Sequence, residues 1–342
     1  MRNAHQMIAP PAIPRLSPPA WGRAGAGGPV ALALTLLLAA PAAADTSAVV
    51  QDHARPGYDA FAKAAATLAT IDGCNPDTLR PAFHAAYDAW MQVAHLHLGP
   101  AEAEGRSLAI LYWPDPKGLG AKAQAALLTG TPLTPEAMAQ HSVAARGLSG
   151  LERLLYPTGT LPADPCPLIQ ATADDLARMG DELTRDWLPF GDLLLTAGQP
   201  GNEKFLKPEE ATQALFTQLA TGLEFIADRQ IGRPLATFDK PRPDLAQGHA
   251  AGRGMQNITL SLQALRDLTQ KLNPDSPKTL AAFDRAITLA RGIESIDSIA
   301  DPQGWLKLEI LQQAVRAARD TAVAELGPAL GVELGFNSQD GD

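Results

Sequence analysis

The sequence predicts an all-α protein made of two packed helical bundles, each of the up-and-down four-helix type. Alanine and leucine dominate the chain, and only 5% of its residues are aromatic. No run of alternating strand residues with hairpin turns is present. Apolar residues instead recur three or four positions apart, which is the period of a helix. One such stripe comprises Leu168, Thr172, Leu176, Met179, Leu183 and Trp187.

Helices are expected, in chain order, at residues 49–71, 77–98, 119–128, 135–156, 168–187, 208–230, 243–272, 277–294 and 302–326. Three of them begin with a capping oxygen directly before a proline at the first helical position, which favours a helix start. These pairs are Thr134-Pro135, Ser276-Pro277 and Asp301-Pro302. The prolines of residues 112–119 exclude a continuous helix there and predict an ordered loop.

The first 44 residues have the features of a cleavable export signal. Arg2, Arg15 and Arg23 precede an apolar run at residues 30–40, and three alanines at 42–44 offer a cleavage site. The run is shorter than the roughly 20 residues that a membrane helix needs, and no later segment is a better candidate. Cleavage of the 342-residue chain would leave 298 residues. We therefore expect a periplasmic protein without a transmembrane segment in its mature chain.

The mature chain is expected to form two domains, because about 300 residues exceed what one helical core usually holds. Residues 189–208 are rich in Gly, Pro and Asn, which indicates a boundary. The expected division is an N-terminal bundle at 45–190, a linker at 191–208 and a C-terminal bundle at 209–342.

Charge and cysteine content narrow the function classes. Loss of the three signal arginines lowers the net charge from −9 to −12, which excludes nucleic acid as a partner. An acidic surface is compatible with cation handling, although solubility alone explains it more simply. Cys74 and Cys166 lie in proline-flanked loops and are expected to pair as a disulfide in an oxidising compartment. Metal ligation is the alternative, but neither cysteine belongs to a Cys-x-x-Cys pair.

The most informative motif is RGLSGLERLLY at residues 146–156. Its hydroxyl, Ser149, and its carboxylate, Glu152, are three residues apart on a predicted helix and can converge on one ligand. Gly147 and Gly150 allow close approach of a ligand or of other backbone. The motif predicts a binding site, while close helix packing is the alternative explanation of the glycines.

Further segments join this motif in a family resemblance. They are AYDAWMQVAHLHLGP (86–100), Arg106, ILYWPDPKG (110–118), FIADRQIGRPL (225–235) and GHAAGRGMQNI (248–258). Together they resemble the imelysin-like family over essentially the whole mature chain. The resemblance implies two helical bundles with a pocket between or beside them, and a role in iron or other metal acquisition. It also implies a Gly-x-His-x-x-Glu site, in which Ser149 here replaces the histidine.

The serine argues against a metallopeptidase. A neutral hydroxyl is a poor ligand for a first-row metal, and the sequence has no His-Glu-x-x-His motif. Nor does Ser149 form a nucleophile elbow, because Leu151 stands where Gly-x-Ser-x-Gly needs glycine. Glu152 remains the metal-ligand candidate, for a divalent cation such as iron or zinc, and no catalytic residue is predicted.

A network around Glu152 completes the predicted site. Arg146 and Arg153 lie nearby in the sequence, and Arg106 and Asp115 come from the resembling loop region. Arg253, with His249 and Asn257 at a spacing of four, forms a polar helix face that is a candidate for the same pocket. The alternatives are a structural ion-pair network and a solvated face.

The histidines are interpreted as surface or capping residues. His84, Asp88 and His95 share one predicted helix, but the two histidines are about 16 Å apart along its axis and cannot share one ion. Ligation of an ion by His95 or His97 together with Glu152 is the alternative. Trp90, Trp113 and Tyr112 are interpreted as core or pocket wall.

Three functions remain open on this evidence. The first is a periplasmic protein that binds a small ligand or metal ion for iron or metal acquisition, with a degenerate motif and no peptidase activity. The second is an exported metal-dependent peptidase or hydrolase, in which Glu152 polarises water. The third is a scaffold whose helical surface docks an envelope protein partner.

Overall fold

The computed structural model describes residues 44–130 and 133–333, and in these ranges the prediction of an all-α protein is confirmed. The extended pairing within them is limited to an isolated bridge between Thr237 and Lys240. None of the helices described is both long and apolar enough to cross a membrane. The predicted export signal falls, apart from residue 44, outside the described residues.

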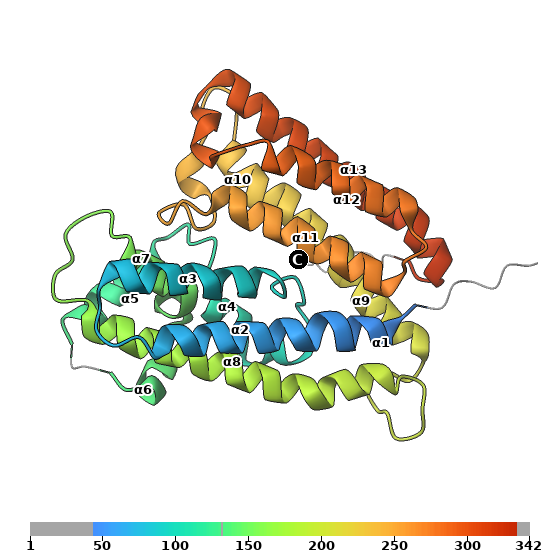
Figure 1. Cartoon of the computed structure of the whole chain (residues 1–342), viewed down its shortest axis with the longest axis horizontal. Helices are drawn as coiled ribbons and strands as arrows, with labels where there is room; N and C mark the ends of the chain where they lie inside the picture. Colours follow the sequence, from blue (N-terminus) through green and yellow to red (C-terminus); the bar gives the residue numbers. More distant parts are fainter. Residues whose placement is uncertain (1–43, 131–132, 334–342) are drawn as a thin grey trace, which may run out of the picture. The chain divides into compact units, whose positions relative to one another are not determined.

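The first helical group, α1 to α8, is built around two long helices that lie against each other (Figure 1). One is a continuous rod in which α1 (Thr46–Val49) and α2 (Arg55–Ala69) are joined by a π-helical segment, Val50–Ala54. The other is α8 (Cys166–Leu195), and α3 (Pro76–Met91) packs on the rod as well. Apolar faces turned toward one another bury aromatic rings such as Tyr58 and Trp187, whose centroids are 5.0 Å apart.

Shorter helices complete this group and place the motif. They are α4 (Arg106–Ile110), α5 (Leu119–Leu128), α6 (Pro135–Ala139) and α7 (Gly147–Leu155). The prediction of one helix at 135–156 is wrong. Gly147 has a φ of 60°, and a Cβ there would lie 2.2 Å from the carbonyl oxygen of Ala109. The chain must turn at this glycine because α7 starts directly against the end of α4.

The second helical group comprises α9 to α13. Its elements are α9 (Pro208–Glu224), a π-helical segment (Phe225–Ile231), α10 (Gly232–Leu235), α11 (Gly254–Leu272), α12 (Pro277–Arg291) and α13 (Pro302–Leu330). The predicted helix at 243–272 is wrong in its first third. Gly248 and Gly252 have φ values of 71° and 69°, so the chain forms a loop until α11 begins. The predicted helix at 77–98 likewise ends early, at Met91.

The helix starts follow the predicted capping chemistry in two cases out of three. Thr134 accepts the N–H of Ala137, and Asp301 accepts the N–H groups of Gln303 and Gly304. Ser276 does not cap α12, because its hydroxyl donates to the carbonyl of Asn273. The carboxylate of Glu325 accepts the first N–H groups of α12 in its place.

The two helical groups meet along α11, which contacts both α3 and the α1–α2 rod. At one end of this contact the N–H of Asp45 donates to the carbonyl of Leu272 at 3.0 Å. Cys74 and Cys166 form a disulfide within the first group, with their Cα atoms 5.5 Å apart. Helix α8 continues past residue 190 to Leu195, and residues 196–207 contain no helix. The division into two domains stays a prediction.

Candidate functional site

A cavity with a volume of about 770 Å³ lies where the two helical groups meet, and we call it the Glu152 cavity. The first group contributes the loop of residues 113–116, parts of α5 and α7, and residues 156–162. The second group contributes Arg233 and residues 244–246 and 248–250. Its charged or titratable wall residues are Asp115, Glu152, Arg153, Tyr156, Arg233, Asp244 and His249.

Glu152 is held at this wall by contacts to both groups. It lies in α7 of the first group, and its Oε1 accepts the N–H of Ala251 from the second group at 3.1 Å. Burial raises the pKa of the Glu152 carboxyl above its usual value. The Ala251 hydrogen bond and the charges of Arg153 and Arg253 oppose this increase in pKa. The carboxyl is therefore partly desolvated and takes up a proton more readily than an exposed glutamate does. A titratable group with such a shifted pKa at a cavity wall is a candidate for ligand binding.

A buried arginine beside the cavity ties the groups together. Arg253 is 0% exposed and donates to Nδ1 of His84 at 2.8 Å, to Asp88 and to Asn257. Its guanidinium also lies 4.3 Å from the ring centre of Tyr87. His84 and Asp88 belong to α3, so this cluster crosses from the second helical group to the first. Of the predicted polar face, Arg253 and Asn257 are thus buried and bind protein groups, whereas His249 is partly exposed and lines the Glu152 cavity.

His84 connects Arg253 to the cavity wall through hydrogen bonds of its two ring nitrogens. Because the Arg253 guanidinium can only donate, Nδ1 of His84 accepts and its Nε2 carries the proton. That Nε2 lies 2.8 Å from the hydroxyl of Tyr156, which lines the Glu152 cavity. Burial and then the charge of Arg253 lower the pKa of His84, which keeps the ring neutral at pH 7. The interpretation of His84 as a surface or capping residue is therefore wrong.

Ser149 and the motif glycines serve packing. The Ser149 hydroxyl donates to the carbonyl of Tyr112 at 3.1 Å, and Ser149 is not among the residues that line the Glu152 cavity. A Cβ on Gly147 or Gly150 would lie 2.2 or 2.3 Å from a backbone carbonyl oxygen. Close approach of backbone thus accounts for both glycines, and no ligand is needed to explain them.

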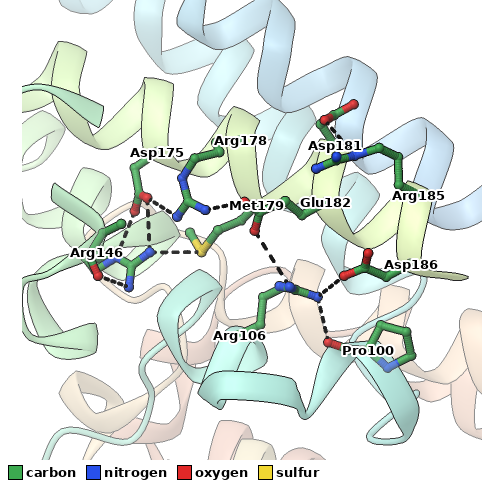
Figure 2. Close-up of polar contacts among 11 residues, drawn as sticks. Pro100, Arg106, Arg146, Asp175, Arg178, Met179, Asp181, Glu182, Arg185 and Asp186 are labelled. Carbon is green, nitrogen blue, oxygen red and sulfur yellow. Dashed lines mark hydrogen bonds and ion pairs between the residues drawn. The ribbon is translucent and has the colours of Figure 1, made fainter. Parts of the chain in front are cut away.

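Two predicted site arginines lie in another network (Figure 2). Arg146 donates to both carboxylate oxygens of Asp175 in α8, at 2.8 and 3.0 Å. Arg106 lies 3.0 Å from Asp186 and 3.7 Å from Glu182, also in α8. Neither arginine contacts Glu152, because the guanidinium group of each forms ion pairs with carboxylates of α8. These contacts correspond to the structural ion-pair alternative.

Asp115 lies at the cavity wall, as predicted. The two carboxylate oxygens of Asp115 accept the N–H groups of Leu119 and Gly120 at 2.8 Å and so cap the start of α5. Arg233 was missed as a site residue, although it lies in one of the segments that carry the family resemblance. Its guanidinium lies 6.0 Å from the ring centre of Trp113, another wall residue.

His53 and His95 lie outside the Glu152 cavity, whereas His249 lines it. His53 and His95 are buried together, with their Nε2 atoms 3.1 Å apart. His95 is therefore not a surface or capping residue either. Across residues 44–130 and 133–333, no three side chains of His, Cys, Asp or Glu are grouped so that they could hold a metal ion. Metal binding by Glu152 stays a prediction.

Comparison with known proteins agrees with the sequence resemblance. Residues 52–328 match the family model described as "Peptidase_M75: Imelysin". The chain is 24% identical over 278 residues to iron-regulated protein A of Synechococcus elongatus, covering 74% of this chain and 75% of that protein.

Two solved structures share the fold. An imelysin-like protein from Psychrobacter arcticum superposes with a TM-score of 0.70 at 22% identity, covering 85% of this chain and 96% of that one. A proposed iron-regulated protein A precursor from Parabacteroides distasonis gives a TM-score of 0.56 at 12% identity, covering 82% and 94%. Because the family model spans most of the sequence, the chain belongs to the imelysin family.

Proposed function

We propose that this protein binds a small polar ligand in the Glu152 cavity and serves iron or other metal acquisition in the periplasm. The observation that carries the proposal is the position of Glu152. Its carboxyl lies at a cavity wall between two helical groups, and within residues 44–130 and 133–333 it accepts one hydrogen bond, from the N–H of Ala251. Contact with a ligand costs such a carboxyl less free energy than it costs an exposed one, because burial has already removed part of its hydration.

The wall chemistry favours a ligand that carries both signs of charge. Glu152 and Asp115 bring carboxylates to the wall, and Arg153 and Arg233 bring guanidinium groups. Both Asp115 oxygens also accept N–H groups at the start of α5, and Arg153 also donates to Gln124 and to the carbonyl of Ala144, so Glu152 and Arg233 are the charged groups with fewer protein contacts. A metal ion held by a small organic anion would satisfy both, since the carboxylate contacts the cation and the arginines contact the anion. Binding of a cation would displace the proton that burial favours on Glu152, so affinity should rise with pH.

Iron is the first metal to test. Two similar proteins carry the name iron-regulated protein A, and this name is the reason for testing iron first. Export remains an expectation from the first 44 residues, and the Cys74–Cys166 disulfide is typical of an oxidising compartment.

Binding is favoured over hydrolysis by the environment of Ser149. A catalytic hydroxyl needs a base within hydrogen-bond reach, yet this hydroxyl donates to the backbone carbonyl of Tyr112. The exported hydrolase and the envelope scaffold are kept as alternatives. Chelator-sensitive cleavage of a peptide library would favour the first, and capture of an envelope protein by a chain without ligand affinity would favour the second.

The test is elemental analysis of the freshly purified protein, followed by calorimetric titration with ferric citrate, citrate alone and zinc chloride. We expect saturable binding of ferric citrate that Glu152→Gln and Arg233→Gln each weaken at least tenfold. Glu294→Gln and Arg285→Gln change the same residue types at exposed positions and should bind as the wild type does.

Three results would contradict the proposal. The first is the absence of any saturable ligand, and the second is equal affinity in all four variants. The third is stoichiometric metal in a Ser149→His variant when the wild type and its citrate titrations show none. That result would mean that the natural chain has lost the binding function of the site.

A further inference from the structure

A second cavity, of about 550 Å³, lies between the same two helical groups, and we call it the His95 cavity. The first group supplies the end of α3, the segment after it, and α4, while the second supplies parts of α9 and α11. Trp113 lines both this cavity and the Glu152 cavity. The volume falls within the range of small-molecule sites, roughly 300 to 1,000 Å³.

The walls of the His95 cavity are largely apolar and partly aromatic. Trp90, Met91, Leu111, Phe225 and Leu265 all face it. Water in such a space finds few hydrogen-bond partners, and wall atoms without a neighbour lose dispersion contacts. An apolar occupant would restore those contacts and release the water.

The buried histidine of this cavity, His95, is held neutral. Asp267 lies 2.7 Å from Nδ1 of His53, whose Nε2 lies 3.1 Å from Nε2 of His95. Burial, followed by the charge of His53, lowers the pKa of His95 well below its usual value. His95 is 8% exposed, and its Nδ1 has no hydrogen-bond partner among the described residues. The wall thus presents an uncharged imidazole, with Gln247 and Ser261 as further neutral groups.

The two cavities differ in the charged residues of their walls. The residues described at the wall of the His95 cavity include no lysine or arginine, and its acidic member, Glu102, is exposed. An anion would find no cationic partner there, in contrast to the Glu152 cavity with Arg153 and Arg233. We propose that the His95 cavity is a second binding site, for an uncharged and largely apolar small molecule. This proposal does not rest on the function proposed for Glu152.

The test is a fluorescence titration of the purified full chain with N-phenyl-1-naphthylamine, a neutral aromatic probe. We expect saturable binding of one probe per chain, with energy transfer from tryptophan because Trp90 and Trp113 line the cavity. An anionic relative of the probe, 8-anilinonaphthalene-1-sulfonate, should bind at least tenfold more weakly.

Variants locate the probe. Thr221→Leu places a larger side chain at the cavity wall and should reduce affinity at least tenfold. Thr217→Leu makes the same change one turn earlier in α9, outside the cavity, and should leave affinity unchanged. Leu108→Asp alters a wall residue that is 53% exposed, so folding tolerates it, and should also weaken binding at least fivefold. Glu152→Gln should bind the probe as the wild type does.

The proposal is overturned by any of three outcomes. Probe fluorescence that rises without saturation would show only non-specific adsorption. Wild-type affinity in both Thr221→Leu and Leu108→Asp would place the probe elsewhere. Equal affinity for the anionic relative would show that the neutral wall does not select the ligand.

Discussion

The buried ion pair between Arg146 and Asp175 should decide the stability of the first helical group. The Asp175 side chain is fully buried and accepts hydrogen bonds from Arg146, at 2.8 and 3.0 Å, and from Arg178, at 2.7 Å (Figure 2). Asp175→Asn keeps the shape of the side chain but removes its charge. Two guanidinium groups then lose their shared counter-charge, and that of Arg146 stays buried.

Breaking a buried pair in this way costs about 3–5 kcal/mol, a large share of a typical stability of about 5–15 kcal/mol. Asp181→Asn is the matched control, because Asp181 lies in the same helix and pairs with Arg185. Its side chain is 72% exposed and that of Arg185 is 64% exposed, so the cost should be about 0–1 kcal/mol. The two variants differ chiefly in burial.

Equilibrium unfolding in urea, with the disulfide intact, measures both variants. We expect a lower midpoint for Asp175→Asn at an unchanged slope, and little change for Asp181→Asn. Added salt should weaken the exposed pair but not the buried one. A loss below about 1 kcal/mol for Asp175→Asn would refute the assignment of Arg146 to a structural role. Ligand affinity of a folded Arg146→Met variant should match that of the wild type.

Three further predictions concern the motif and the disulfide. Because burial raises the pKa of Glu152, the folded state holds that proton more tightly than the unfolded chain, and stability is lost as pH rises through the folded pKa. Glu152→Gln should therefore unfold at a higher urea concentration than the wild type at pH 7 and at the same one below about pH 4, and equal midpoints at pH 7 would contradict this. Replacement of Cys74 and Cys166 by alanine opens a link across 92 residues and should cost about 2–5 kcal/mol, seen as a lower melting temperature; an unchanged value would argue against the bond. Gly147→Ala should destabilise more than Gly73→Ala in urea, because both have positive φ but only the first places its Cβ against backbone; similar losses would refute the packing explanation.

Much of the fold could be predicted because its signals are local. Spacing of apolar residues, proline positions and capping oxygens act over a few neighbours, so the class and most helices follow from them. Two of the errors came where the chain meets residues far away in the sequence. The helix predicted at 135–156 is interrupted, and α7 begins anew at Gly147 against the carbonyl of Ala109. The start of α12 is capped by the side chain of Glu325, while the Ser276 hydroxyl donates to Asn273.

The candidate site was predicted less completely, because spacing on one helix shows only which residues share a face. The motif spacing identified Glu152, the family resemblance identified Asp115, and both residues line the cavity. Spacing could not show that Arg146 and Arg106 would pair with α8, since their acidic partners are far away in the sequence. Arg233 gave only a weak signal, within a segment that carries the family resemblance.

The sequence by itself determined an all-α chain of the imelysin family with a distinctive carboxylate at Glu152. Only the tertiary structure decided what surrounds that carboxylate. Glu152 meets Ala251 across 99 residues, and Arg253 meets His84 across 169. Contacts of this kind depend on how whole helices dock, and docking is set by the sum of many buried surfaces that no short motif contains.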